Sequence, residues 1–289
     1  CCRLGVYGLN IQSALADLGY EAKYLELSLY DGIKGLFKFF HDLLGKDDWV
    51  AAAKASIMMI RMVFALDDLE TLLAYYRARE VKIGDAERHY NKCLNMYKEV
   101  NRIKKAVKKE MAKTEIDKKR EILNVDITGE IYLVGDPFSN QYIERELGKM
   151  GVQTRRSLTV SSFLKDAIIP KIFRNGETHL QRANRMAKPY LMRDIGGDAL
   201  ECVSDVAFAD MKHRDGIIHV SPFTCMPEIM SQNIFPAMRE DHNIPILTLV
   251  MDEQSGKAGY ITRLEAFVDL MRRKKRKAVI ENKKTAEKV

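Results

Sequence analysis

The sequence predicts an α/β fold in which a parallel sheet carries a long helical insertion. Residues 126–270 alternate short apolar runs with helical stretches, which is typical of buried parallel strands joined by crossover helices. Residues 31–124 show apolar residues at helical spacing and contain no proline. The chain of 289 residues is long enough for one large domain or two smaller ones.

Four strands are expected in the second half of the chain. The apolar runs place them at residues 130–134, 152–155, 216–220 and 246–250, and a helix is expected from near Ser139. An open parallel sheet binds its ligands outside the carboxyl ends of its strands. The segments in which we expect a site are therefore 136–140, 221–228 and 252–259.

The first half of the chain predicts mainly helices. A helix from Val6 to Leu18 should end at Gly19, and a short strand is expected at 24–27. Residues 85–123 have the pattern of an amphipathic helical segment with one narrow apolar face. The predicted organisation is a partial first α/β unit (1–30), a helical insertion (31–125), an α/β domain (126–270) and a basic C-terminal tail (271–289).

The net charge of +7 comes from the C-terminal tail alone. Residues 272–289 hold nine Lys or Arg and two Glu, which account for the whole charge, so the rest of the chain is formally neutral. A local basic run after a helix indicates a solvated helix end. This distribution argues against nucleic acid as a partner.

The sequence indicates a cytoplasmic protein without a membrane partner. The apolar stretch Ala51–Leu66 is interrupted by Lys54 and Arg61 and falls short of the roughly 18 residues that span a bilayer. There is no signal-peptide pattern, and five cysteines are too few for a secreted disulfide framework. The chain starts at Cys1 and not at Met, so we interpret it as a piece of a longer protein.

Cys225 is the residue that most suggests chemistry. It follows the strand expected at 216–220 and precedes an expected helix, in a turn stiffened by Pro222 and Pro227. A thiol at a helix N-terminus is favoured as thiolate, the form that binds iron or attacks an electrophile. The alternative is a small buried cysteine in a tight turn.

The other cysteines are weaker candidates. Cys1 and Cys2 form a vicinal pair beside Arg3, which would favour thiolate, although the pair could also reflect only where the chain begins. Cys93 and Cys202 are each expected to be packed in a helix.

Known motifs for metals and nucleotides are missing from the sequence. There is no CxxC or HExxH spacing, no GxxxxGK[ST] loop and no GxGxxG after a strand. His219 lies in an expected strand and is expected to be a hydrogen-bonded core residue. These absences argue against ATP hydrolysis by this chain.

Several segments resemble proteins related to 2-hydroxyacyl-CoA dehydratases and their activators. They are PFTCMPEI (222–229), DEQSGKAGYITRLEAFVDL (252–270) and GEIYLVGDPFSNQYIERELGKMGV (129–152). CRLGVYG (2–8) is similar to the family's cysteine-containing CRFG-type turn, and Trp49 with 68–70 and 77–80 is similar to its helical insertion. The resemblance is to the acyl-CoA dehydratase activase-related, or CoA-activase C-terminal, regions, and it spans nearly the whole chain except the basic tail.

The resemblance implies Rossmann-like α/β units with a helical insertion and a [4Fe–4S] cluster held by cysteine thiolates. In the dehydratases, an ATP-dependent activator delivers one electron to such a cluster, which reduces an acyl-CoA to a ketyl radical. Cys2 and Cys225 are then the expected ligands. Cys1 would substitute for a cysteine-containing segment that the family carries upstream and that this chain lacks.

The expected function is therefore that of an iron–sulfur component of a 2-hydroxyacyl-CoA dehydratase or activator-type system in an anaerobic cell. It would be a lyase component or its electron-transfer partner, with one-electron reductive chemistry on an acyl-CoA. The expected partners are an ATP-dependent activator protein or fused activase domains, with acyl-CoA as a further candidate. The alternatives are a related cluster-containing reductase of another small molecule and a non-catalytic scaffold that has lost the cluster. The substrate and the oligomeric state stay open.

Overall fold

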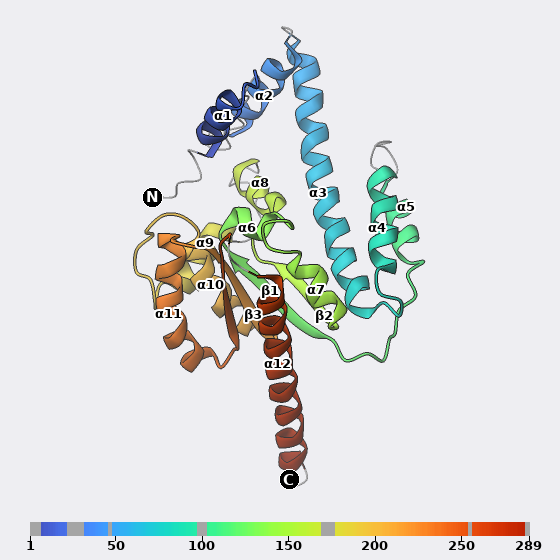
Figure 1. Cartoon of the computed structure of the whole chain (residues 1–289), viewed down its shortest axis with the longest axis vertical. Helices are drawn as coiled ribbons and strands as arrows, with labels where there is room; N and C mark the ends of the chain where they lie inside the picture. Colours follow the sequence, from blue (N-terminus) through green and yellow to red (C-terminus); the bar gives the residue numbers. More distant parts are fainter. Residues whose placement is uncertain are drawn as a thin grey trace. The chain divides into compact units, whose positions relative to one another are not determined.

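The computed structural model describes residues 7–21, 32–45, 48–96, 103–168, 177–253 and 256–286. These residues form 12 helices and four strands (Figure 1). The chain divides into two compact units, the first made of residues 1–67 and 160–179 and the second of residues 68–159 and 180–289. The predicted α/β class is confirmed, because the second unit contains an all-parallel sheet with helices around it.

The sheet has the strand order β2-β1-β3-β4. The strands are β1 (Leu123–Gly129), β2 (Val152–Arg156), β3 (Gly216–Pro222) and β4 (Ile246–Met251). The chain passes from β1 to β2 on one side and then returns to β3 on the other side of β1. The carboxyl ends of β1 and β3 therefore flank a topological switch point, where open parallel sheets bind ligands.

The predictions for β2, β3 and β4 are confirmed, and the prediction for the first strand is wrong. Residues 130–134 lie beyond β1, and helix α6 (Ile131–Gly135) occupies this stretch. Gly129 ends the strand with φ +139°, and a Cβ at this position would lie 1.9 Å from the Val220 carbonyl oxygen. The Glu130 side chain then caps α6 by accepting a hydrogen bond from the Leu133 amide at 3.0 Å.

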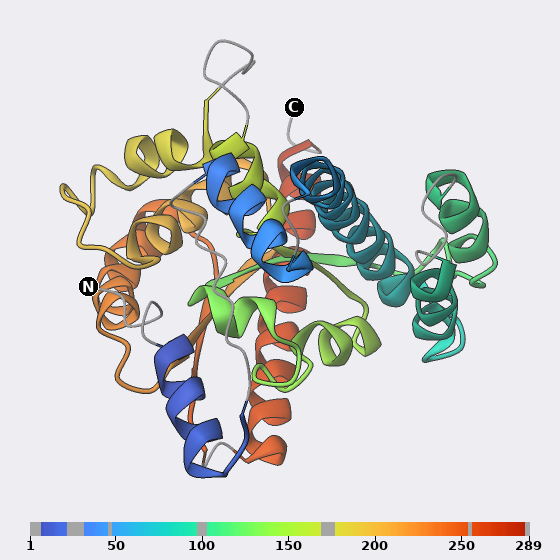
Figure 2. The ribbon, with the colours of Figure 1, turned by 90° about the horizontal axis from the view of Figure 1, so that it is seen from above.

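Helices cover both faces of the sheet, as predicted. On one face, α6, α7 (Ile143–Lys149) and α12 (Lys257–Ala286) pack on an apolar cluster that includes Ile218. On the other face, α9 (His179–Ala187), α10 (Ala199–Met211) and α11 (Met226–His242) pack on a cluster that includes Ile217. Successive residues of a strand point to opposite faces, so the two clusters lie on opposite sides of the sheet. In Figure 2 the strands lie between α11 (orange) and α12 (red-orange).

The first unit is helical in its described residues. It contains α1 (Tyr7–Asp17), α2 (Gly32–Leu44), the N-terminal part of α3 (Trp49–Arg79) and α8 (Val160–Ile168). Within this unit, the Asp67 carboxylate accepts a hydrogen bond from the Ser161 amide at 3.1 Å. The strand predicted at 24–27 lies outside the described residues.

In the second unit, α4 (Asp85–Met96) and α5 (Ile103–Met111) pack against each other. The Glu80 carboxylate fixes the start of α4, because it accepts hydrogen bonds from the amides of Gly84 at 2.9 Å and Ala86 at 2.8 Å. In its described residues, the amphipathic segment predicted at 85–123 therefore forms α4 and α5, and it ends in the first residue of β1.

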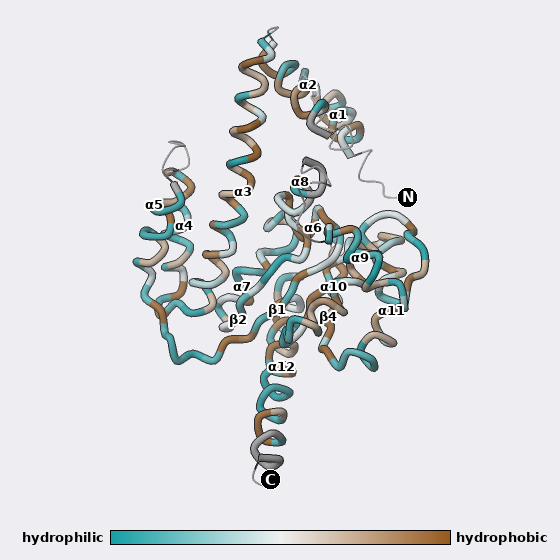
Figure 3. The backbone as a smooth tube through the Cα atoms, turned by 180° about the vertical axis from the view of Figure 1, so that it is seen from behind, coloured by the Kyte–Doolittle hydropathy of each residue, from teal (hydrophilic) through white to brown (hydrophobic). Residues whose placement is uncertain are grey.

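The basic C-terminal residues continue α12 as far as Ala286. Met271 is buried, the Arg272 guanidinium donates to the Met150 carbonyl at 2.6 Å, and the Lys275 ammonium donates to the Ile122 carbonyl at 3.0 Å. From residue 276 to residue 281 the side chains are exposed, and Figure 3 shows that this end of the helix is mainly hydrophilic. The predicted solvated helix end thus starts near residue 276.

Helix α3 is the only described helix that is long and apolar enough to cross a membrane by length and composition. Lys54 and Arg61, which interrupt the apolar stretch in the sequence, both lie within this helix of 31 residues. Only 11% of that window is buried. The absence of a membrane partner stays a prediction.

Candidate functional site

Cys225 lies at the carboxyl edge of the sheet, in the turn between β3 and α11. It is the N-cap residue of α11, and its side chain is half-buried. The turn is tight, because Thr224 has φ +64° and the Cys225 amide donates to the Pro222 carbonyl at 3.2 Å. Pro227 occupies the first turn of the helix, where a missing N–H costs little. The predicted place of Cys225, between a buried strand and a helix N-terminus, is confirmed.

The segments around this turn are held close to one another. Gly197 has φ +71°, and a Cβ there would lie 2.6 Å from a Pro227 ring carbon, so the loop before α10 packs on the first turn of α11. The next residue, Asp198, accepts a hydrogen bond from the Ile131 amide at 3.0 Å, which ties α10 to α6. The segments that follow β1 and β3 thus meet the start of α10 at the switch point.

The other predicted cysteine ligands cannot be placed beside Cys225. Cys1 and Cys2 lie outside the described residues, so their approach to Cys225 stays a prediction. Cys93 is fully buried in α4 and Cys202 is fully buried in α10, as predicted for packed helix residues. In the described part of the chain, no group of three potential metal ligands includes Cys225.

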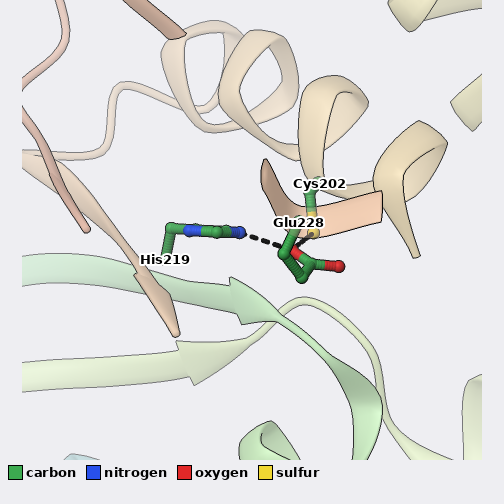
Figure 4. Close-up of side chains that lie close together, drawn as sticks. All are labelled: Cys202, His219 and Glu228. Atoms are coloured by element: carbon green, nitrogen blue, oxygen red, sulfur yellow. Dashed lines mark hydrogen bonds and ion pairs between the residues drawn. The ribbon is translucent and has the colours of Figure 1, made fainter. Parts of the chain in front are cut away.

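Three other potential metal ligands meet on the face of the sheet that α10 and α11 cover. They are Cys202 from α10, His219 from β3 and Glu228 from the first turn of α11 (Figure 4). One donor atom from each residue lies within 4.8 Å of the other two, and all three residues are closed to solvent. Figure 4 shows the imidazole and the thiol directed at the same carboxylate.

The Oε2 atom of Glu228 is the centre of this group. It is hydrogen-bonded to Nε2 of His219, and the Cys202 thiol donates to it at 3.3 Å. The other carboxylate oxygen, Oε1, and the Nδ1 atom of His219 have no hydrogen-bond partner. A buried polar atom left without a partner costs about 1–3 kcal/mol. Two buried polar atoms of this group, Oε1 of Glu228 and Nδ1 of His219, are therefore left without a hydrogen bond.

This group belongs to a wider polar layer on the same face of the sheet. Thr128 is the register neighbour of His219, and its hydroxyl donates to Oδ2 of Asp205 at 2.7 Å. Asp126, also on β1, forms an ion pair with Arg155 of β2. Buried polar groups need such partners. One face of the sheet thus carries the apolar cluster that includes Ile218, and the other combines an apolar cluster with a buried polar layer between the strands and α10.

Burial raises the pKa values of several acids in this layer. It raises the pKa of Asp205 to about 7, that of Glu201 to about 7 and that of Asp198 to about 6, with neighbouring carboxylates adding to each effect. Burial first, and the Glu228 carboxylate second, raise the pKa of the Cys202 thiol well above its usual value. A cation bound here would relieve this repulsion between like charges.

A separate cavity of about 180 Å³ lies between α3, α4 and α7 in the second unit. Two of the arginines that line it are paired: Arg77 with Glu87 at 2.6 Å, and Arg156 with Glu144 at 2.7 Å. A phosphate-bearing ligand such as CoA would have to compete with these carboxylates for the guanidinium groups.

The group at Cys202, His219 and Glu228 was missed by sequence reasoning. Cys202 and His219 are correctly predicted as core residues, but Glu228 was not singled out. The three residues come from three different elements, so their separation along the chain matches no metal motif. The one available signal is the imidazole of His219 inside the otherwise apolar run Gly216–Val220.

Comparison with known proteins does not identify the chain. No protein-family model matches it, and no curated protein is significantly similar to it. The resemblance to dehydratase activators therefore stays an expectation.

Proposed function

We propose that the chain is an iron–sulfur component of a 2-hydroxyacyl-CoA dehydratase or activator-type system, with Cys225 as a ligand of a [4Fe–4S] cluster. The place of Cys225 is the observation that carries this proposal. Its thiol is half-buried at the carboxyl edge of the sheet, beside the switch point and at the N-terminus of α11. Ligands of open parallel sheets bind at this edge, and a helix N-terminus favours thiolate.

The surroundings of Cys225 suit one ligand of such a cluster. Iron–sulfur clusters are held by several cysteine thiolates, and Cys2 and Cys1 are the proposed further ligands by resemblance. Both lie outside the described residues. A cluster bound there would supply reversible transfer of one electron to an acyl-CoA.

Apolar side chains beside Cys225 support contact with a partner at this edge. Phe223 and Met226 flank the turn and are 67% and 62% exposed. Exposed apolar side chains next to a redox group suit docking of a protein that delivers electrons. The proposed partner is the ATP-dependent activator, as a separate protein or as fused activase domains, in the cytoplasm.

The proposal is tested by purifying the chain without oxygen and measuring iron, acid-labile sulfide and visible absorbance. We expect equal amounts of iron and sulfide, with a charge-transfer absorbance that one-electron reduction bleaches. A chain without iron or sulfide would contradict the proposal and favour a scaffold that has lost the cluster. A chain with the cluster that an acyl-CoA dehydratase activator fails to reduce would point to a related reductase of another small molecule.

A further inference from the structure

We propose that Cys202, His219 and Glu228 form a mononuclear site for a divalent metal ion, with Zn²⁺ as the best match. This site lies between β3, α10 and α11, and it is distinct from the cluster proposed at Cys225. Thiolate, imidazole and carboxylate are the donor types that zinc prefers in proteins. The set is mixed, so it differs from the carboxylate-only clusters that are common without any metal.

The spacing of the donor atoms fits a single ion. Zinc bonds sulfur at about 2.3 Å and nitrogen or oxygen at about 2.0–2.2 Å, so ligand atoms around tetrahedral zinc lie about 3.3–3.7 Å apart. Sγ of Cys202 lies 3.3 Å from Oε2 of Glu228, and all three donor atoms lie within 4.8 Å of one another. The Nε2 atom of His219 lies closer to Oε2 than this, so the imidazole and the carboxylate would separate slightly to admit the ion.

The unpartnered carboxylate oxygen is a second, independent observation. Oε1 of Glu228 has no hydrogen-bond partner, although the side chain is only 1% exposed. Bidentate coordination by Glu228 would use this oxygen and complete a fourth position around the ion. Binding would release the thiol proton of Cys202, and the imidazole would carry its hydrogen on Nδ1.

Charge in the surrounding layer favours a cation. Asp205 lies in α10 three residues after Cys202, and Asp198 is the N-cap residue of the same helix. A dication beside these carboxylates offsets the repulsion between them and Glu228, and it stabilises a thiolate. Such a site would join the strand to both helices, and through the first turn of α11 it would fix the position of Cys225.

The experiment loads the full chain with Zn²⁺ during refolding and measures bound metal after dialysis against a weak chelator. The wild-type chain should retain about one zinc ion and gain thermal stability, because the metal binds only the folded state. Cys202→Ala should lose the ion and the gain in stability. Cys93→Ala is the matched control, because it also changes a fully buried helix cysteine, and it should retain the ion.

Substitution with Co²⁺ keeps the proposal testable if Cys202→Ala fails to fold. In a variant that keeps Cys202 as its one cysteine (Cys1→Ser, Cys2→Ser, Cys93→Ala and Cys225→Ser), bound Co²⁺ should show thiolate-to-metal charge-transfer absorbance. The proposal is overturned if this absorbance is absent, if the wild-type chain retains no zinc, or if Cys202→Ala retains as much as wild type. The Cys225→Ser variant should keep zinc whether or not it loses iron, so the two metal proposals succeed or fail separately.

Discussion

His219 in β3 and Glu228 in the first turn of α11 are hydrogen-bonded to each other in a place closed to solvent. This hydrogen bond therefore joins β3 to α11, the helix whose N-cap residue is Cys225. The Cys202 thiol donates to the same carboxylate oxygen. Glu228 therefore connects the buried polar layer with the exposed edge of the sheet.

Replacing Glu228 by Ala should destabilise the chain in metal-free buffer. The substitution leaves the imidazole of His219 and the thiol of Cys202 buried without their acceptor, at a cost of about 1–3 kcal/mol. Denaturant unfolding measures this loss. The double variant His219→Phe, Glu228→Leu removes both partners and should be less destabilised than the sum of its single changes. Additive effects in this cycle would show that the two side chains do not interact.

Replacing Gly129 by Ala should also destabilise the fold. The residue has φ +139°, and the new Cβ would overlap the Val220 carbonyl oxygen, where β1 and β3 run side by side. The expected loss in the free energy of unfolding is on the order of 2 kcal/mol or more. Gly135→Ala is the control, because nothing lies within 4 Å of the Cβ position there. Equal stability of the two variants would mean that Gly129 does not end β1 in this way.

The first strand shows where sequence patterns are insufficient to place an element. The run Ile131–Val134 is apolar and rich in residues that favour strands, yet it forms most of α6. The apolar pattern does not predict β1, because Asp126 and Thr128 alternate with its apolar residues and are also buried. Their partners, Arg155 and Asp205, are distant in sequence, so burial of these polar groups follows from tertiary contacts alone.

The two candidate sites also differ in how far the sequence predicts them. Cys225 could be placed from the sequence, because a strand, a proline-bounded turn and a helix start are local features. The contact between Cys202 and Glu228 depends on how α10 and α11 pack on β3. Local sequence patterns do not predict this packing. Apolar runs, in contrast, locate β2, β3 and β4 well, since these strands bury apolar residues at positions that periodicity reveals.

Acid should weaken the contact between α4 and α5. Interaction with Lys113 and His89 lowers the pKa of Glu110 to about 2, below its usual value of 4.5. A lowered pKa adds stability that is fully present above pH 4.5 and disappears as the pH falls towards 2. Glu110→Gln should therefore lower the free energy of unfolding at pH 7, by about 1–3 kcal/mol, and lower it by clearly less near pH 2.5, where the carboxylate has lost part of its charge.

Urea unfolding of Glu110→Gln and wild type at both pH values measures this difference. Glu115→Gln, at an exposed position of the same segment, should have no effect at either pH. A loss from Glu110→Gln that is the same at both pH values would contradict the role given to the ionised carboxylate.

The C-terminal end of α12 should be dispensable for folding only beyond Lys275. A chain that ends at Lys275 keeps the buried Met271 and the contacts of Arg272 and Lys275 with backbone carbonyls. Its thermal midpoint should lie within a few degrees of the full chain, because exposed residues contribute about 0.5 kcal/mol or less. A chain that ends at Leu270 loses Met271 and should melt clearly lower. Equal melting of both truncated chains would show that Met271 does not stabilise the sheet.

The most direct test of the proposed function is the iron content of Cys225→Ser beside that of Cys93→Ser, both purified without oxygen and both checked for folding by circular dichroism. Cys93 is buried in α4, where it packs between helices, and its replacement should leave the iron unchanged. Cys225→Ser removes the thiolate at the carboxyl edge of the sheet and should abolish bound iron with little effect on the fold. Full iron content in folded Cys225→Ser would contradict the assignment of Cys225 as a cluster ligand.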